Sequence, residues 1–360
     1  MSKDTKPVRA SENLDWENLQ KYVRGKLKEI LGDDFDETAK FEVEQFPGGH
    51  SNLTYLLRFG TQEFVLRRPP FGDIPAKAHD MAREFRILET VHPVYNLAPR
   101  PFVLCEDAEI IGSTFYVMER RKGIVIRNSE PAEIENNPAK RRKVSEAMID
   151  ALVALHKIDI EKQNLTTLGK PEGFVTRQVN GWTKRWHNSK TVEISEMNFL
   201  SKWLSSNLPP ETTKPTLVHG DFKLDNAMFD AETCEKIVGV FDWEMSAIGD
   251  PLIDLGILIC YWIHWAKIVE MSKIKSLEIV TIKDGWFSRE EIIENYRAKS
   301  GRDLTNFTFY EVFAVFKLAV VLQQIFYRYH KGQTDDPRFA KLGETVKFLA
   351  ETAVNLLKRS

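Results

Sequence analysis

Two short polar motifs, close together in the chain, limit its possible folds more than any other feature. Residues 219–226 read His-Gly-Asp-Phe-Lys-Leu-Asp-Asn, and residues 241–244 read Phe-Asp-Trp-Glu. Short apolar runs on both sides of the polar stretch 230–236 predict a β-hairpin between the motifs. The hairpin would return Asp242 to the neighbourhood of Asn226. The alternative is a His-Gly-Asp turn followed by an unrelated carboxylate on a core strand.

The side chains in these motifs suit phosphoryl transfer. Asp221 and Asn226 are five positions apart, which is the spacing of the catalytic Asp and the metal-binding Asn in the catalytic loop of protein kinases. Asp242 stands where kinases have the Asp of Asp-Phe-Gly. We expect Asp221 to accept the proton of an attacking hydroxyl. We expect Asn226 and Asp242 to hold Mg²⁺, which prefers a few oxygen ligands together with phosphate.

Composition narrows the functional classes. The chain has 360 residues, of which 42% are hydrophobic, and this is enough for one two-lobed enzyme or two domains. The net charge of −2 gives no general attraction to nucleic acid or membranes, and no apolar run reaches the ~18 residues of a membrane span. The N-terminus lacks an apolar signal core, and the three cysteines show no metal-ligand spacing. We expect a cytoplasmic protein with no nucleic-acid or membrane partner; the oligomeric state is open.

The order of predicted elements indicates an α+β fold with a small antiparallel-sheet lobe and a larger, mainly helical lobe. Residues 1–13 are polar and are expected to be disordered. The first lobe is taken as 14–119 and the second as 120–360. The predicted strands are 41–46, 53–59, 63–67, 101–105 and 114–119, and the predicted helices are 16–30, 77–91, 139–157, 192–206, 251–265, 288–299, 308–330 and 337–357.

At these motifs the chain resembles the aminoglycoside phosphotransferase (phosphotransferase enzyme) family, which is distantly kinase-like. The family carries His-Gly-Asp-x-x-x-x-Asn, then Asp-Trp-Glu, then Gly-Asp-Pro-x-x-Asp-Leu, and residues 249–255 match the third element. The segment 63–88 is similar to the kinase-like domain fused to some acyl-CoA dehydrogenases. The resemblance implies a two-lobed, protein-kinase-like fold. It also implies transfer of the γ-phosphate of ATP or GTP, with Mg²⁺, to a hydroxyl of a small molecule.

The resemblance further implies a phosphate-binding loop between the first two strands. Gly48 and Gly49 would let backbone N–H groups approach phosphate oxygens without a Cβ clash. Ser51 and Asn52 complete a match to the Gly-x-Ser-Asn of the family. By itself a Gly-Gly turn between strands is usually only a hairpin.

A basic position near the end of the third strand is the second part of the expected nucleotide site. Kinases carry there a Lys that binds phosphates and pairs with a helix Glu, whereas this chain has Arg67 and Arg68. We expect Arg67 to take this place and to pair with Glu84. The reach of Arg differs from that of Lys, so two alternatives stay open. Arg68 could be the phosphate-binding cation, or the two arginines could be a surface pair at a strand end.

The resemblance places adenine recognition after the last strand of the first lobe. It puts the Glu119 carbonyl and the Arg121 N–H at the purine edge, with Met118 behind the ring. His219 and Asp254 are expected to organise the catalytic loop rather than to react. Asp254 would do so by accepting hydrogen bonds from loop N–H groups.

The acceptor is less constrained. Residues 251–360 carry 16 Lys and Arg against 13 Asp and Glu, which does not suit a polycationic aminoglycoside. A hydroxy acid or hydroxyacyl-CoA is the preferred acceptor, with Arg177, Arg185 and His264 as candidate ligands. Aminoglycoside, choline-type and sugar kinases are alternatives. A catalytically silent, nucleotide-binding pseudokinase is a further alternative. The one feature that favours it is Arg67 in place of the usual Lys. A protein kinase is disfavoured, since no Ala-Pro-Glu motif follows Asp242.

Overall fold

The chain folds into two compact units. The computed structural model describes residues 4–47, 52–72, 80–265 and 280–358. The first unit contains residues 1–122 together with 239–244, and the second contains 123–238 and 245–360. Asp242 therefore belongs to the first unit, although it follows more than a hundred residues of the second.

Among the described residues of the first unit, five strands form an antiparallel sheet in the order β1-β2-β3-β5-β4. The strands are β1 (Phe41–Gln45), β2 (Leu53–Phe59), β3 (Gln62–Arg68), β4 (Pro101–Cys105) and β5 (Phe115–Glu119), and the helices are α1 (Trp16–Leu31), α2 (Met81–Val91) and the short α3 (Ala108–Ile111). The five predicted strands are thus confirmed. Helix α2 begins at Met81, after the N-cap Asp80, and the predicted start at 77 lies outside the described residues.

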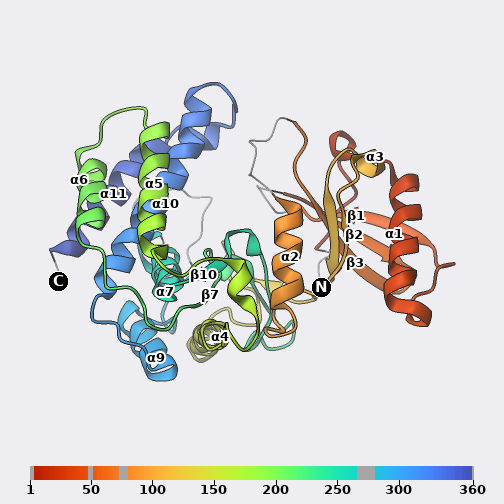
Figure 1. The fold of residues 1–360 in the computed structure, drawn as a ribbon, viewed down its shortest axis with the longest axis horizontal. Coiled ribbons are helices and arrows are strands. Elements are labelled where there is room, and N and C mark those ends of the chain that lie inside the picture. Colours follow the sequence, from red (N-terminus) through yellow and green to blue (C-terminus); the bar gives the residue numbers. More distant parts are fainter. Residues whose placement is uncertain (1–3, 48–51, 73–79, 266–279, 359–360) are drawn as a thin grey trace. The chain divides into compact units, whose positions relative to one another are not determined.

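Helices α1 and α2 cover opposite faces of this sheet (Figure 1). Alternation along β5 explains the arrangement, because successive strand side chains point to opposite faces. Phe115 and Val117 join Leu19 and Val23 of α1 in one hydrophobic core. Between them in sequence, Tyr116 turns to the other face, where its ring packs edge-on against Phe85 of α2. The sheet is therefore buried on both sides, which fixes its register.

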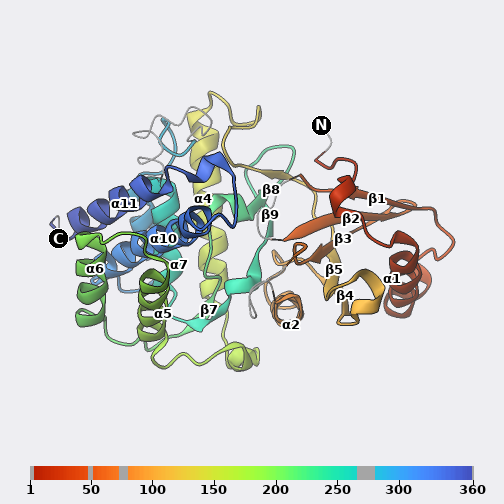
Figure 2. The same cartoon turned by 90° about the horizontal axis from the view of Figure 1, so that it is seen from above.

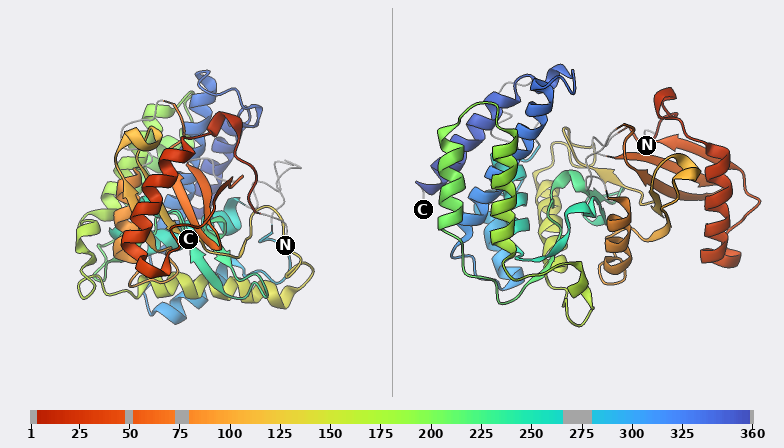
Figure 3. Two further views of the ribbon diagram at one scale, coloured as in Figure 1. Left: turned by 90° about the vertical axis from the view of Figure 1, so that its right-hand side faces the viewer. Right: turned by 45° about the horizontal axis from the view of Figure 1, so that its top comes forward.

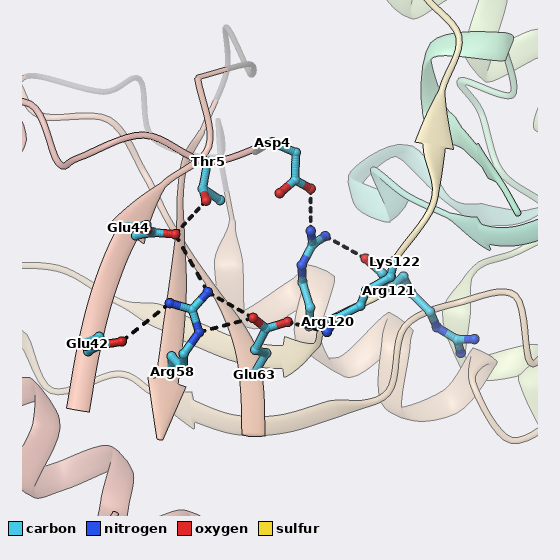
Figure 4. A network of polar contacts seen from close by, with 9 residues as sticks. All are labelled: Asp4, Thr5, Glu42, Glu44, Arg58, Glu63, Arg120, Arg121 and Lys122. Atoms are coloured by element: carbon cyan, nitrogen blue, oxygen red, sulfur yellow. Dashed lines mark hydrogen bonds and ion pairs between the residues drawn. The ribbon is translucent and has the colours of Figure 1, made fainter. Parts of the chain in front are cut away.

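Residues 4–13, which the sequence predicts to be disordered, make specific contacts with the sheet. Lys6 pairs with Gln45 through two backbone hydrogen bonds of 2.8 Å, which adds a rung at the edge of β1. Asp4 contacts Arg120, and Thr5 donates to Glu44 in a network centred on Arg58 (Figure 4). Backbone pairing at a sheet edge needs no apolar pattern. The polar composition of this segment therefore gave no sign that it would be ordered.

The second unit is mainly helical. Its helices are α4 (Pro138–His156), α5 (Phe174–Ser189), α6 (Ser195–Ser206), α7 (Leu252–Ile259), α9 (Arg289–Ser300), α10 (Phe307–His330) and α11 (Leu342–Leu357). Its short strands are β6 (Ile124–Val125), β7 (Thr216–Val218), β8 (Ala227–Phe229), β9 (Ile237–Val240, whose last two residues belong to the first unit) and β10 (Ala247–Gly249). Strand β8 pairs with β6 and β9, and β7 pairs with β10. The predicted hairpin is present as β8 and β9.

Helix α10 is the central helix of this unit, with α5, α7 and α11 packed around it (Figure 2). It is long and apolar enough to cross a membrane by length and composition. However, 78% of its most apolar stretch is buried against the rest of the protein, which is typical of a core helix. The green helices α5 and α6 run side by side at its flank (Figure 3).

Several helix ends differ from prediction. The expected helix 251–265 is α-helical only to Ile259 and continues as a π-helix over Cys260–Trp265. Residues Pro337–Phe339 form a separate 3₁₀ turn before α11. Helix α9 begins with a capping box formed by Ser288 and Glu291, with both reciprocal hydrogen bonds present. Helix α5 was not predicted.

Candidate active site

The loop after β7 carries the first motif on a backbone shape that only glycine tolerates. Gly220 has a φ of +82°, and a Cβ there would lie 2.7 Å from the Met245 carbonyl oxygen. This left-handed conformation is costly for other residues. The loop therefore turns sharply between His219 and Asp221, so that consecutive residues face different surroundings.

Asp254 holds this turn from α7. One of its carboxylate oxygens accepts the His219 N–H and the other accepts the Gly220 N–H, each at 2.7 Å. His156 lies 3.3 Å from the first oxygen and 2.8 Å from the Tyr296 hydroxyl. Burial alone would raise the pKa of Asp254, but the hydrogen bonds from His156 and the loop hold it below its usual value. Asp254 is thus an ionised brace, and His156 is a satisfied core residue.

His219 is fully buried, and its Nδ1 accepts the Asp221 N–H at 3.2 Å. Its position supports the loop from inside and does not offer the ring to solvent. A role in loop organisation agrees with this placement.

Asp221 stands at the surface of the loop and is held by one of its two carboxylate oxygens. Oδ2 accepts from Lys223 Nζ at 2.7 Å and from Asn226 Nδ2 at 3.0 Å. Among the described residues nothing donates to Oδ1, which leaves one oxygen available to a substrate hydroxyl. Because Asn226 uses its amide nitrogen on Asp221, its amide oxygen is turned outward, also without a donor in the described parts of the chain.

Lys223 is a site residue that sequence reasoning missed. It lies two positions after Asp221, inside the motif, and this spacing was the available signal. Its ammonium lies 4.6 Å from the centre of the Tyr261 ring. Burial opposes its charge, yet Tyr261 and Asp221 keep the pKa of Lys223 above its ordinary value. The group is therefore a fixed positive charge beside the carboxylate.

Arg67, at the end of β3, joins two carboxylates in the first unit. Its Nη1 lies 2.9 Å from Glu84 of α2, and its Nη2 lies 3.2 Å from Asp242. Arg68 instead donates to the carbonyls of Pro69 and Ile111 and stacks on Phe71. Arg67 is therefore the arginine that contacts Glu84.

The Arg67–Glu84 pair lies deep in the unit, with Glu84 only 1% exposed. Burial raises the pKa of Glu84 above its ordinary value, although the charge of Arg67 acts in the opposite direction. Burial also disfavours the charge on Arg67, but Glu84 outweighs it and the pKa of Arg67 stays above its ordinary value. Glu84 without Arg67 would be an uncompensated buried charge, whereas Arg67 without Glu84 would still have Asp242 as a partner.

Asp242 occupies a left-handed backbone conformation, with a φ of +69°. Asp tolerates this region better than most residues. Trp243 anchors the turn by donating its indole N–H to the Val240 carbonyl at 2.8 Å. Arg67 occupies Oδ1, and among the described residues no donor reaches Oδ2.

The side chains expected to hold Mg²⁺ have the donor atoms such an ion takes. Asn226 and Asp242 each present one oxygen without an internal hydrogen bond, and hard divalent cations bind oxygen and keep several water or phosphate ligands. The described residues contain no cluster of three or more His, Cys, Asp or Glu able to hold a metal alone. By its donor atom, each of these two side chains fits an ion that arrives with nucleotide phosphates.

The other expected nucleotide residues lie in the first unit. Asn52 is buried immediately before β2, whereas Gly48, Gly49 and Ser51 lie outside the described residues. Met118 is buried on β5. The Glu119 carboxylate accepts the Arg100 N–H at 3.0 Å and pairs with Arg121 at 2.9 Å. The side chains of Glu119 and Arg121 thus brace the segment that was expected to meet the purine.

The three expected acceptor ligands lie apart in the second unit. Arg177 donates to the backbone carbonyls of Lys170 and Glu172. Arg185 stacks on the Trp182 ring at 4.5 Å. His264 bonds the buried Glu311 at 2.6 Å and lines a pocket of about 730 Å³ between α9, α10 and α11. The structure does not gather them at one point.

Comparison with known proteins identifies relatives of this arrangement. The sequence profile of the phosphotransferase enzyme family matches residues 42–275. Acyl-CoA dehydrogenase family member 11 of Rattus norvegicus is 34% identical over the whole chain, which corresponds to 45% of that protein. The chain thus spans about half the length of the curated relatives it matches.

Solved structures show the same fold. A Ralstonia eutropha protein, provisionally assigned as an aminoglycoside phosphotransferase, is 28% identical and superposes with a TM-score of 0.79 over 96% of this chain and 99% of its own. An aminoglycoside phosphotransferase in a ternary complex with ADP and hygromycin B is 13% identical, with a TM-score of 0.57 over 94% of this chain and 98% of its own. The expected kinase-like α+β fold is confirmed.

Proposed function

Because the chain belongs to the phosphotransferase enzyme family, we propose that it transfers the γ-phosphate of ATP or GTP to a hydroxyl of a small molecule. The catalytic loop carries this proposal: Asp254 braces a glycine turn that presents Asp221 with one carboxylate oxygen unbonded. A base must lie within hydrogen-bond reach of the hydroxyl whose proton it takes. The unbonded oxygen of Asp221 supports this role, because it is available for such a bond and the ionised Asp254 braces the loop behind it.

Five side chains have distinct parts in this proposal. Asp221 orients the acceptor hydroxyl and accepts its proton, and Lys223 keeps the carboxylate in place. Asn226 and Asp242 offer oxygens to Mg²⁺, which neutralises phosphate charge when bound. Arg67, fixed by Glu84, supplies the cation that other kinases supply as lysine, and its planar fork can contact phosphate and carboxylate together.

For the acceptor we propose a hydroxy acid or hydroxyacyl-CoA. Relatives named as acyl-CoA dehydrogenases support this chemistry, because the chain matches them along its full length. The segment 251–360 has no acidic excess that would attract a polycation. Lys223 beside Asp221 adds positive charge where the acceptor must lie.

A nucleotide-binding protein without turnover is the second candidate. The observation in its favour is the ion pair between Arg67 and Asp242, which occupies one oxygen of the proposed metal ligand. A single assay separates the candidates: the purified chain with Mg·ATP is presented with hydroxy acids, their CoA esters, amino alcohols, sugars and kanamycin. We expect phosphorylation of hydroxy acids or their CoA esters. Turnover only on kanamycin would overturn the acceptor proposal, and nucleotide binding without any turnover would overturn the kinase.

A further inference from the structure

Lys317 on α10 is a buried ammonium group without a carboxylate partner. The residue is 8% exposed, and its Nζ donates to the Gly220 carbonyl at 2.6 Å. Among the described residues no carboxylate lies within ion-pair distance of it. Burial lowers the pKa of Lys317 below its ordinary value. A buried cation is costly unless paired, so its presence here calls for a reason beyond packing.

The carbonyl that Lys317 contacts belongs to the peptide bond that enters Asp221. Asp254 holds the N–H of Gly220 at 2.7 Å, while Lys317 holds its carbonyl oxygen. Because the peptide group is planar, fixing this oxygen fixes the direction in which the chain enters Asp221. Gly220, with a φ of +82°, has no Cβ to limit rotation about its backbone bonds. The turn is therefore clamped from two helices, α7 and α10.

Aromatic and charged neighbours restrain the ammonium group. It lies 5.3 Å from the centre of the Trp182 ring, and Met245 Sδ lies 4.0 Å away. Arg185 stacks on the same indole at 4.5 Å. The strongest electrostatic attraction on Lys317 comes from Asp221, followed by Asp254. The position and the charge of Lys317 thus both act on the catalytic loop.

We propose that Lys317 is a positioning residue for Asp221, holding the Gly220 peptide so that the free carboxylate oxygen meets the acceptor hydroxyl. This proposal rests on the proposed phosphotransferase function. The sequence motifs do not predict this role for α10, because Lys317 and Gly220 are 97 positions apart in the chain. A misplacement of about 1 Å at a reacting group can cost on the order of 10²-fold in rate.

The test compares Lys317→Met with Lys317→Arg and with a matched control, Gln323→Met. Gln323 lies on the same helix, is 1% exposed and also donates to a backbone carbonyl, that of Ser189 at 2.8 Å, away from the catalytic loop. We expect Lys317→Met to lower kcat by ~10- to 100-fold with the KM for Mg·ATP within about twofold of wild type. Lys317→Arg should recover part of the loss, and Gln323→Met should keep wild-type kcat.

A second readout does not require turnover. Amide hydrogen exchange at residues 220–222 should accelerate on the order of tenfold in Lys317→Met and stay unchanged in Gln323→Met. Equal kcat and equal loop exchange in the two Met variants would overturn the positioning role. If the wild-type chain phosphorylates no acceptor but the exchange difference is present, the positioning role stands and the phosphotransferase proposal fails.

Discussion

Three of the acidic side chains in the motifs, Asp221, Asp242 and Asp254, are held in three different ways. Both carboxylate oxygens of Asp254 accept hydrogen bonds from loop N–H groups. One oxygen of Asp221 contacts Lys223 and Asn226, and one oxygen of Asp242 contacts Arg67. The bracing Asp254 therefore has no oxygen left, whereas Asp221, proposed to bind substrate, and Asp242, proposed to bind metal, each keep one. Such a division of roles is expected where one carboxylate supports and others act.

Replacing Asp221 tests the proposed base directly. Asp221→Asn keeps the shape of the side chain but removes its basicity, so kcat should fall by ~10²–10⁴-fold while Mg·ATP affinity is retained. The measurement is a coupled assay of ADP release with the true acceptor, together with calorimetric titration of the nucleotide. Glu232→Gln, on the exposed turn between β8 and β9, serves as control and should keep its activity. A near wild-type rate for Asp221→Asn would contradict the assignment.

Replacing Arg67 tests the buried pair in the first unit. Arg67→Met leaves Glu84 as an unpaired buried carboxylate and should cost about 3–5 kcal/mol of stability, whereas the double variant with Glu84→Gln should regain a large part of it. Denaturant unfolding of wild type, both single variants and the double variant measures the coupling. Nucleotide affinity should remain weak in the double variant, because its cation is still missing. Additive losses of stability would show that the two side chains do not depend on each other.

At the scale of elements, prediction from sequence worked where apolar runs are distinct and failed where packing decides. Strands β2 and β3 are short apolar runs bounded by polar residues, and α10 is a long, largely apolar segment, so these elements were predictable. Helix α5 was not, because Asn180, Gly181 and Thr183 are poor helix formers and its N-terminal glycine cap offers no side-chain signal. Its Trp182 and Trp186 are buried within the unit, which supplies the missing stability.

The candidate site divides along the same line. Asp221 and Asn226 are five residues apart, so their contact follows from the motif itself. The contacts of His156 with Asp254 and of Lys317 with Gly220 span 98 and 97 positions. No local pattern encodes such pairs, since they arise only when α4, α7 and α10 pack together. Sequence therefore predicted the brace from Asp254, but not the long-range contacts that His156 and Lys317 make.

A cluster of charged side chains, Glu311 of α10 with Arg289 of α9 and His264, joins these elements. Its loss should lower the free energy of unfolding at acid pH. Glu311 is 1% exposed; burial would raise its pKa, but hydrogen bonds from His264 and Arg289 bring it from its ordinary 4.5 to about 2. A carboxylate with a lowered pKa in the folded state stabilises above its unfolded pKa and loses that contribution as pH falls toward 2. The contribution is on the order of 3 kcal/mol.

We therefore expect the free energy of unfolding of the second unit to decline between pH 4.5 and about 2, with Glu311 contributing to the slope. Urea unfolding at a series of pH values measures this dependence. Glu311→Gln should be less stable at pH 7 and should show a shallower decline in that range. Glu290→Gln, which alters an exposed neighbour of Arg289, is the control. If stability falls with pH as steeply in Glu311→Gln as in wild type, then this cluster does not cause the acid sensitivity.

At the scale of the whole molecule, the chain returns to its first unit for residues 239–244. Asp242 consequently shares a unit with Arg67 and Glu84, while Asp221 and Asn226 belong to the other. A ligand that binds the folded protein raises its apparent stability by mass action, by about 2.7 kcal/mol at a hundredfold excess over Kd. Nucleotide binding should therefore appear as a shift in thermal unfolding.

We expect Mg·ATP to raise the Tm of the chain by about 5 °C at that excess, and ATP with a chelator in place of Mg²⁺ to raise it far less. Asp242→Asn should lose most of the Mg²⁺-dependent part. Asn is preferred to Ala here because it also tolerates the left-handed backbone at this position and keeps an oxygen for Arg67. Glu106→Gln, an exposed carboxylate of the same unit, is the control and should behave as wild type. If Asp242→Asn keeps the full Mg²⁺-dependent shift, then Asp242 is not a metal ligand, and the ion pair with Arg67 would be its sole function.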